Sequence, residues 1–268
     1  MGIVAIVGAG VMGETLLSGL LRSGRATGDL LVAERRPERI TELTAKYDVK
    51  VVSNQEAAAA ANTLVLVVKP QDMAGVLGEV GEHLRAGTLV VSLAAGITTD
   101  FLQTRLPTGT PVVRVMPNTP ALVDEGMAAI SPGSHCDDAH LAEAEALLRS
   151  CGKVIRVPEN YQDAVTAISG SGPAYIFYVV EAMIEAGVLL GLPRATSTEL
   201  VVQTLYGAAT MLKETGEHPT VLREQVSSPA GTTMAALRQL DDHKVRAAFL
   251  TAMEAARDRS RELASGQT

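Results

Sequence analysis

The chain opens with Ile3-Val4-Ala5-Ile6-Val7-Gly8-Ala9-Gly10-Val11-Met12-Gly13, an apolar run followed at once by three spaced glycines. Such a run, rich in β-branched residues, is typical of a strand that is buried on both faces. After the glycines, four leucines between positions 16 and 21 recur at the spacing of one helix face. A GxGxxG turn between a strand and a helix is the pattern that binds the pyrophosphate of a dinucleotide. The stretch therefore predicts a Rossmann-type domain.

Each glycine of this turn has its own expected role. Gly8 permits a tight turn, Gly10 lets the backbone approach a pyrophosphate, and Gly13 lets the helix pack closely on the strand. The N–H groups at the start of the helix then present the positive end of the helix dipole to the phosphates. A glycine-rich turn in some other α/β protein is the alternative interpretation. We expect the whole turn to contact a cofactor: Gly8, Ala9, Gly10, Val11, Met12 and Gly13.

The composition limits the classes of function. The chain has 268 residues, enough for one large domain or two modest ones, and 47% of them are apolar. A net charge of −7 without a Lys/Arg cluster argues against nucleic acid as a partner. The chain has two cysteines, too few for a disulfide framework, and no signal peptide is recognisable. Two glycines and a proline interrupt the longest uncharged stretch, residues 164–180, which argues against a membrane span. We expect a cytoplasmic protein.

Strand and helix patterns alternate through residues 1–158. Helical patterns lie between most of the strands, for example over residues 37–46 and 137–150. This rhythm predicts an α/β domain with a doubly wound, mostly parallel sheet, in which the closely spaced later strands are partly antiparallel. The predicted strands are Ile3–Val7, Leu30–Ala33, Lys50–Val52, Thr63–Val68, Leu89–Ser92, Val112–Met116, Met127–Ile130 and Val154–Val157.

Residues 159–268 form a second predicted domain, which is all helical. The pattern over 174–190 is apolar nearly all round, whereas those over 195–214 and 244–264 are more amphipathic. A helix that is apolar on every side must be buried on every side, so we expect a second subunit to cover it. Prolines mark the expected helix starts, where a missing N–H costs little: Pro193, Pro219 and Pro229.

Ligands of parallel α/β sheets bind outside the carboxyl ends of the strands. Several segments at these ends are candidates for cofactor binding, but each has a simpler interpretation. Lys69 can be a solvated charge, Asn118 between two prolines can fix a turn, and the small residues 94–96 are ordinary at a strand end. The candidates are Asn54, Val67, Val68, Lys69, Pro70, Ala94, Ala95, Gly96 and Asn118.

The second predicted strand ends in Glu34-Arg35-Arg36, where such folds contact the adenosine ribose. Glu34 alone favours NADH, since a carboxylate can bond the ribose 2′-OH and repels a 2′-phosphate. Arg35 and Arg36 follow directly, and a guanidinium group suits that phosphate. We expect a preference for NADPH, with NADH possible and Arg35 as the main contact.

The helical domain carries two further motifs, Ser169–Tyr175 and Ser227–Thr233. The second places hydroxyls and free N–H groups at a helix N-terminus, which is a potential anion site. An ordinary N-cap with Pro229 at the first helical position explains it equally well. The histidines have no metal-site spacing, and no metal is expected.

Taken together, these segments resemble pyrroline-5-carboxylate reductase, the last enzyme of proline biosynthesis. The resemblance covers nearly the whole chain and implies a Rossmann domain, an all-helical dimerisation domain, and NAD(P)H and the cyclic imine in the cleft between them. It also implies a homodimer that can assemble to a decamer. The matching segments are GAGVMG from Gly8, VVKPQ from Val67, SLAAGI from Ser92, RVMPNTP from Arg114, SGSGPAY from Ser169 and SSPAGTT from Ser227.

The resemblance assigns substrate binding to Ser228, Gly231, Thr232 and Thr233. The Ser228 hydroxyl and the N–H groups of Thr232 and Thr233 would hold the substrate carboxylate, and the Thr233 hydroxyl would be the catalytic group that donates or relays the proton. One departure is Ala230, where the family usually has glycine, and a methyl group there alters the turn if φ must be positive.

Two other functions stay open. The first is reduction of a related imine, such as a six-membered one, or of a ketone. The second is a non-catalytic NADP-binding sensor. Residues 169–182 contain no lysine, whereas the related β-hydroxyacid dehydrogenases carry a catalytic lysine on that helix, so alcohol oxidation is disfavoured.

Overall fold

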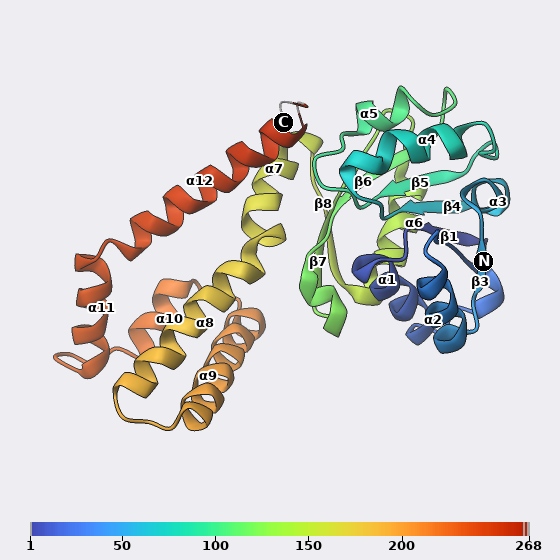
Figure 1. The fold of residues 1–268 in the computed structure, drawn as a ribbon. Helices are drawn as coiled ribbons and strands as arrows, with labels where there is room; N and C mark the ends of the chain where they lie inside the picture. The colour runs from blue at the N-terminus through green and yellow to red at the C-terminus, as the bar shows by residue number, and fades with distance from the viewer. Residues whose placement is uncertain (1, 265, 267–268) are drawn as a thin grey trace. The chain divides into compact units, whose positions relative to one another are not determined.

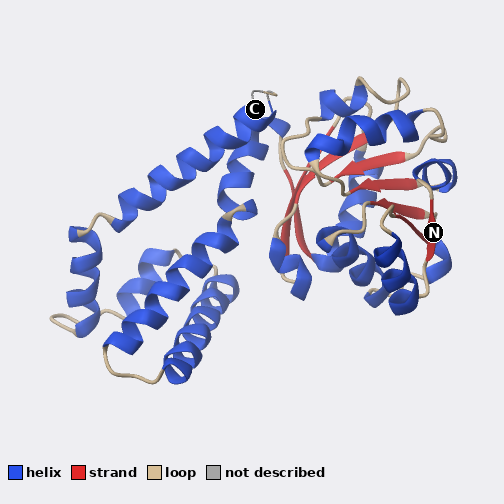
Figure 2. Cartoon of the chain, in the orientation of Figure 1, coloured by secondary structure: helices blue, strands red, loops and turns tan. Residues whose placement is uncertain are grey.

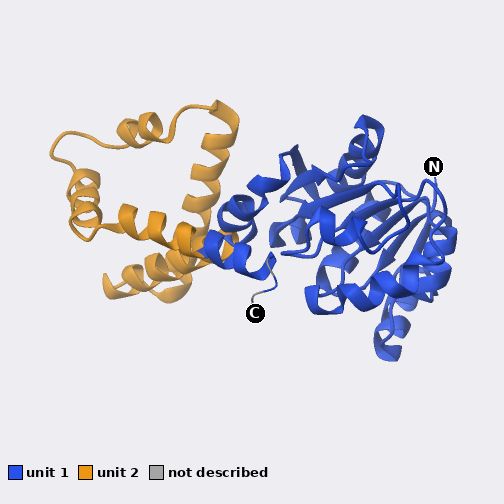
Figure 3. Ribbon diagram, turned by 90° about the horizontal axis from the view of Figure 1, so that it is seen from above, with its two compact units in different colours: residues 1–171, 256–268 blue, residues 172–255 orange. Residues whose placement is uncertain are grey.

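The computed structural model describes residues 2–264 and 266. The chain divides into two compact units, residues 1–171 with 256–268 and residues 172–255 (Figure 3). Every strand of the described residues belongs to the first unit, and residues 172–255 contain only helices and loops (Figure 2). The α/β domain followed by a helical region is confirmed. The domain boundary at residue 158 stays a prediction. The compact units themselves divide after Ser171.

The first unit contains one eight-stranded sheet with the order β3-β2-β1-β4-β5-β6-β7-β8 (Figure 1). Of the described strands, only β6 and β7 pair antiparallel, which confirms the mostly parallel sheet. The predicted strand over 63–68 ends at Leu66, so Val67 and Val68 lie in the connection that follows it. The strands are β1 Val4–Val7, β2 Leu30–Ala33, β3 Lys50–Val52, β4 Thr63–Leu66, β5 Leu89–Ser92, β6 Val112–Met116, β7 Gly126–Pro132 and β8 Gly152–Arg156.

The helices predicted over residues 37–46, 137–150, 174–190, 195–214 and 244–264 are present, with ends within about two residues of those limits. Short 3-10 turns and one π-helical turn at Thr166–Gly170 join some of them. The helices are α1 Val11–Arg22, α2 Pro37–Tyr47, α3 Asn54–Ala60, α4 Met73–Gly81, α5 Thr99–Gln103, α6 Asp138–Leu148, α7 Gln162–Val165, α8 Gly172–Leu189, α9 Arg194–Thr215, α10 Pro219–Gln225, α11 Thr232–Asp242 and α12 Val245–Ala264.

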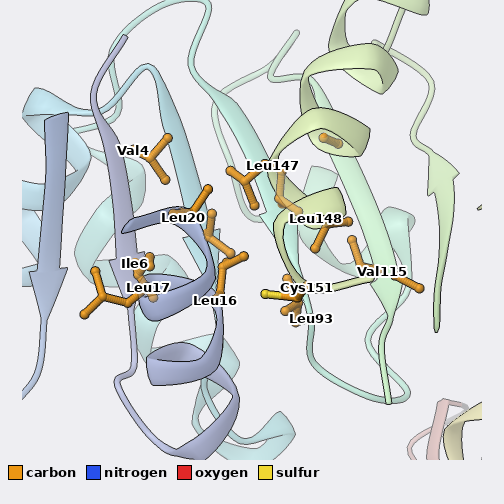
Figure 4. Packing of buried hydrophobic residues seen from close by; sticks show 14 of the residues in the cluster. Val4, Ile6, Leu16, Leu17, Leu20, Leu93, Val115, Leu147, Leu148 and Cys151 are labelled. Carbon is orange, nitrogen blue, oxygen red and sulfur yellow. The ribbon is translucent and has the colours of Figure 1, made fainter. Parts of the chain in front are cut away.

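Two apolar layers cover the two faces of the sheet. Because successive strand residues point to opposite faces, β1 contributes Val4 and Ile6 to one layer and Ala5 and Val7 to the other. The first layer includes residues of α1, α2 and α6, and Figure 4 shows the leucines of α1 and α6 against the sheet. The second layer includes residues of α3, α4 and α5. Burial on both faces explains why the strand sequences are continuously apolar rather than alternating.

The strand order reverses between β1 and β4. From β1 the chain moves outward to β2 and β3, then returns across the sheet to β4 on the other side of β1. The connections after β1 and β4 therefore leave the same edge in opposite directions and separate there. In open α/β sheets this is the place where ligands bind.

The prediction that Pro229 stands at the first position of a helix is wrong. Helix α11 begins at Thr232, with Gly231 as its N-cap. Pro229 and Ala230 instead form a turn, closed by a 3.0 Å hydrogen bond from the Gly231 N–H to the Ser228 carbonyl. By contrast, Pro219 is the first residue of α10.

Helix α8 packs on α9 but leaves most of its apolar surface open. Within the described chain none of its residues is buried, and Phe177, Tyr178 and Leu189 are 66%, 75% and 88% exposed. By length and composition alone, residues Glu159–Leu189 are also apolar enough to cross a membrane, a possibility that the sequence pattern disfavoured. An apolar helix surface of this size needs a cover in water.

We expect that cover to be a second copy of the chain, so the protein should remain dimeric when diluted to nanomolar concentration. A core-like interface of this kind buries more than about 2,000 Å² in total. Phe177→Glu should shift the mass measured by mass photometry from dimer to monomer. The control is Leu122→Glu, which charges a 55% exposed apolar residue of the first unit and should leave the dimer intact. A folded, active wild-type monomer would contradict the expectation.

Candidate functional site

The glycine turn has three different backbone environments. Gly8 has a φ of +92°, and a Cβ there would lie 2.7 Å from the Val67 carbonyl oxygen. A Cβ on Gly13 would lie 2.1 Å from the Gly8 carbonyl oxygen, so only glycine lets α1 start this close to β1. At Gly10, by contrast, no atom lies within 4 Å of the Cβ position. The turn is therefore tight at both ends and has free space at its centre.

A cavity of about 650 Å³ opens beside this turn, at the carboxyl edge of β1, β2 and β4. It lies at the point where the strand order reverses, and the first N–H groups of α1 have no acceptor within their own helix. The size of the cavity, the glycines that line it and these free donors fit a dinucleotide. Eight of the predicted cofactor residues line it: Gly8, Gly10, Arg35, Arg36, Asn54, Val67, Val68 and Lys69.

The other predicted cofactor residues do not line this cavity. Ala9 and Gly13 are buried, and Val11, the first residue of α1, is 69% exposed. Met12 and Asn118 line a small neighbouring hollow instead. Those that follow β4 and β5 lie in connecting segments: Pro70, Ala94, Ala95 and Gly96.

The Asn118 side chain is already engaged within the first unit. Its amide nitrogen donates to the Ser169 carbonyl at 3.1 Å, and its amide oxygen accepts from the Met127 N–H at 2.8 Å. These bonds tie the π-helical turn to β7. They favour the simpler interpretation of Asn118 as a residue that fixes local structure.

Glu34, at the end of β2, is turned back onto its own loop. It accepts hydrogen bonds from the N–H groups of Arg35 and Arg36, at 2.9 and 3.0 Å, and from the Arg36 guanidinium group. Burial alone would raise the pKa of Glu34, but the side chain of Arg36 and these two N–H groups lower it to about 2. Glu34 is therefore a charged acceptor whose oxygens are occupied by the loop itself.

Arg35 makes a different ion pair, with Glu79 of α4. The second oxygen of Glu79 accepts a 2.7 Å hydrogen bond from the Asn54 amide. Hydrogen bonds from Arg35 and then from Asn54 lower the pKa of Glu79. Sequence reasoning missed Glu79 because it is 44 positions from Arg35 on a separate helix. Only the pairing of β1 with both β2 and β4 indicates that α4 can reach this place.

A second group of charges connects the glycine turn to α2. The Arg39 guanidinium group bonds the Ala9 carbonyl at 3.0 Å and also pairs with Glu14 of α1. Lys46 and Tyr47 donate to the other Glu14 oxygen, at 2.9 and 2.7 Å. Burial alone would raise the pKa of Glu14, but the hydrogen bonds from Lys46, Arg39 and Tyr47 lower it to about 2. The turn is thus held by side chains as well as by glycine packing.

The predicted substrate residues lie together at the start of α11, in the second unit. Gly231 is the N-cap and makes no side-chain cap within the described structure, so the first N–H groups of α11, including those of Thr232 and Thr233, lack an intrahelical acceptor. The Ser228 hydroxyl lies against Gly231, where a Cβ would approach its oxygen to 2.3 Å. The segment thus brings one hydroxyl and several free donors into one short loop.

Ala230 adopts the left-handed conformation, with a φ of +57°. This is the backbone region that favours glycine, so the turn before α11 requires a positive φ at this position. The sequence left this requirement open, and the structure meets it with an alanine.

Among residues 2–264 and 266, no group of three or more His, Cys, Asp and Glu side chains is placed to hold a metal ion. The two groups of candidate residues therefore offer glycine backbone, helix N-terminal donors, arginines and hydroxyls. These are groups that bind phosphates and carboxylates.

Comparison with known proteins identifies both regions of the chain. Residues 3–96 match the family described as NADP oxidoreductase, coenzyme F420-dependent, and residues 159–263 match the family described as pyrroline-5-carboxylate reductase dimerisation. The pyrroline-5-carboxylate reductase of Corynebacterium melassecola is 47% identical, over 97% of this chain and 98% of its own length.

Two solved structures extend this similarity to the fold. A pyrroline-5-carboxylate reductase from Coxiella burnetii has a TM-score of 0.93 and 35% identity, covering 98% of each chain. A pyrroline carboxylate reductase from Plasmodium falciparum, solved with NADP bound, has a TM-score of 0.88 and 28% identity, again covering 98% of each chain. Because the relationship spans nearly the full length at these identities, this chain belongs to the pyrroline-5-carboxylate reductase family.

Proposed function

We propose that this protein reduces 1-pyrroline-5-carboxylate to L-proline, with NADPH as the preferred reductant. One observation supports the proposal in addition to family membership. Eight residues that the sequence assigned to cofactor binding line one cavity at the switch point of the sheet, where the strand order reverses between β1 and β4. A C=N reduction needs a hydride on carbon and a proton on nitrogen. NADPH supplies the hydride when bound.

The cofactor end of the chemistry is assigned to the first unit. The free N–H groups of α1 and the open space at Gly10 suit a pyrophosphate, since the backbone can approach it there without a clash. Arg35 lines the same cavity from the end of β2, and its guanidinium group suits a 2′-phosphate. Lys69 lines the cavity from the connection after β4 and adds a further positive charge.

The substrate end is assigned to the start of α11. The substrate carries a carboxylate, and three donors are assigned to its two oxygens: the Ser228 hydroxyl and the N–H groups of Thr232 and Thr233. The Thr233 hydroxyl is the proposed proton donor or relay to the ring nitrogen. A protonated iminium is already electrophilic, so these residues mainly orient the substrate and place charge.

The helical region makes the protein a dimer through its dimerisation domain. Assembly of dimers into a decamer is a further proposal, and so is a cytoplasmic location without a membrane or nucleic-acid partner. The net charge of −7 supports the lack of nucleic-acid binding. The exposed apolar surface of α8 is assigned to the partner subunit rather than to lipid.

The direct test is NADPH oxidation, followed by absorbance, with pyrroline-5-carboxylate and with its six-membered homologue. Turnover with the five-membered substrate at the higher kcat/KM supports the proposal. Preference for the six-membered ring would assign the other imine activity, and cofactor binding without turnover of either would indicate a sensor.

Arg35→Ala should weaken NADPH binding by about ten- to a hundred-fold, because a charge-assisted contact to phosphate contributes about 1.5–3 kcal/mol. NADH binding should change much less, since it lacks the 2′-phosphate. Dissociation constants can be measured by fluorescence titration without substrate. The matched control is Arg149→Ala, a 64% exposed arginine outside the cavity. Equal NADPH affinity in wild type and Arg35→Ala would contradict the assignment.

Thr233→Ala should lower kcat by about ten- to a thousand-fold with a smaller change in substrate KM, because it removes the hydroxyl and keeps the backbone donor. Ser228→Ala should act mainly on KM, since its hydroxyl is assigned to the carboxylate. Steady-state kinetics at pH 6–9 separate the two effects.

The control for these variants is Thr232→Ala, which removes the neighbouring hydroxyl but keeps its N–H and should leave kcat nearly unchanged. Thr233→Ser, which retains a hydroxyl, should recover part of the lost kcat. If Thr233→Ala keeps full kcat and KM across this pH range, the Thr233 hydroxyl has no catalytic role, and the start of α11 at most binds the substrate carboxylate.

A further inference from the structure

Both arginines at the adenosine end of the cavity already have acidic partners from the chain itself. Arg36 pairs with Glu34 of the same loop, and Arg35 pairs with Glu79 of α4. A 2′-phosphate that binds here therefore meets paired charges rather than free cations. It must share a guanidinium group with a carboxylate, or displace that carboxylate.

The two acids are not equivalent. The Glu34 side chain is only 8% exposed and its oxygens accept four hydrogen bonds from the loop, so its charge is screened by its own donors. Both acids line the cavity, but the Glu79 side chain is more exposed, at 34%. Glu79 is thus the carboxylate presented to a ligand, although Glu34 occupies the position that the sequence pattern associates with the ribose.

Glu79 also reaches two candidate cofactor residues at once. One oxygen pairs with Arg35 and the other accepts from the Asn54 amide at 2.7 Å. Any anion that Arg35 binds while this pair persists lies close to a negative charge, which opposes it. A neutral 2′-hydroxyl meets no such repulsion, and it can donate a hydrogen bond to a carboxylate.

We infer that Glu79 is a specificity-determining residue, whose carboxylate beside Arg35 and Asn54 weakens binding of a 2′-phosphorylated cofactor relative to its 2′-hydroxyl counterpart. The inference rests on the NADPH use proposed above. The arginines provide the preference for NADPH over NADH, and Glu79 makes that preference smaller. NADH therefore remains a usable ligand of the same cavity.

The test is Glu79→Gln, which keeps the size of the side chain and removes its charge. The ratio of the NADH dissociation constant to that of NADPH should rise about 5- to 20-fold, as expected for loss of one partly screened like charge. The same ratio should rise for the fragments 5′-AMP and 2′,5′-ADP, measured by calorimetry. Because the effect is electrostatic, it should shrink in 0.5 M salt, unlike a change in packing.

Matched variants separate charge from structure. Glu79→Asp retains the carboxylate and should keep a ratio near that of wild type, whereas Glu79→Ala should raise it as Glu79→Gln does. Glu82→Gln removes a charge just after the same helix, outside the cavity, and should leave the ratio unchanged. Should Glu79→Gln fold poorly, the Ala and Asp pair gives the same comparison.

An unchanged ratio in Glu79→Gln and Glu79→Ala would overturn the inference. A lower ratio would also overturn it, because Glu79 would then serve to hold Arg35 in place for the phosphate. These binding measurements need no turnover, so they remain informative if pyrroline-5-carboxylate is not reduced. The failure of the proposed reaction and the failure of this inference are therefore distinguishable.

Discussion

The arrangement of the first unit depends on the close approach between the start of α1 and the end of β1. Because a Cβ on Gly13 would lie 2.1 Å from the Gly8 carbonyl oxygen, the helix can begin at this point only with glycine at position 13. This approach fixes the direction of α1 over one face of the sheet, where its leucines enter the apolar layer (Figure 4). It also leaves the first N–H groups of α1 beside the cavity at the switch point. Packing and ligand geometry therefore have the same local cause.

Three groups of paired charges surround this turn within the first unit. Arg39 links the Ala9 carbonyl to Glu14, while Glu34 and Glu79 occupy the arginines that follow β2. The Arg35–Glu79 pair is largely exposed to solvent, and such pairs contribute little stability. Their consequence here is positional, because Arg35 and Arg36 are each held at the wall of the cavity by an acid. An anionic ligand that binds in such a site replaces or shares the carboxylate partner of an arginine, rather than entering a pocket of unpaired positive charges.

Much of the fold follows from local sequence patterns. The apolar strand runs and the GxGxxG turn predicted the parallel sheet, and five strands have the predicted limits at both ends or differ by one residue at one end. The carboxyl-end rule then brought Gly10, Arg35, Asn54 and Lys69 to one place, because it depends only on strand order. Patterns of this kind are properties of short segments, so they can be recognised without tertiary information.

The features that the sequence did not predict depend on contacts between distant segments. Glu79 approaches Arg35 only because β4 lies beside β1, and the two bonds of Asn118 need the fold of β7 and the π-helical turn. Pro229 was misplaced for a local reason. Proline suits the first position of a helix and also the second position of a β-turn, and only the bond from Gly231 to Ser228 distinguishes the two.

The alanine in the loop before α11 has a consequence for the entropy of that loop. Holding Ala230 at a φ of +57° costs about 1–2 kcal/mol relative to the right-handed region. Yet a residue with a Cβ visits far fewer backbone states than glycine, so a loop with alanine loses less freedom when it is ordered. At a positive φ, however, the strain of alanine exceeds this entropic gain. An anion that binds at the start of α11 therefore meets a backbone that carries strain, and contacts within the loop, such as the bond from the Gly231 N–H to the Ser228 carbonyl, hold its shape.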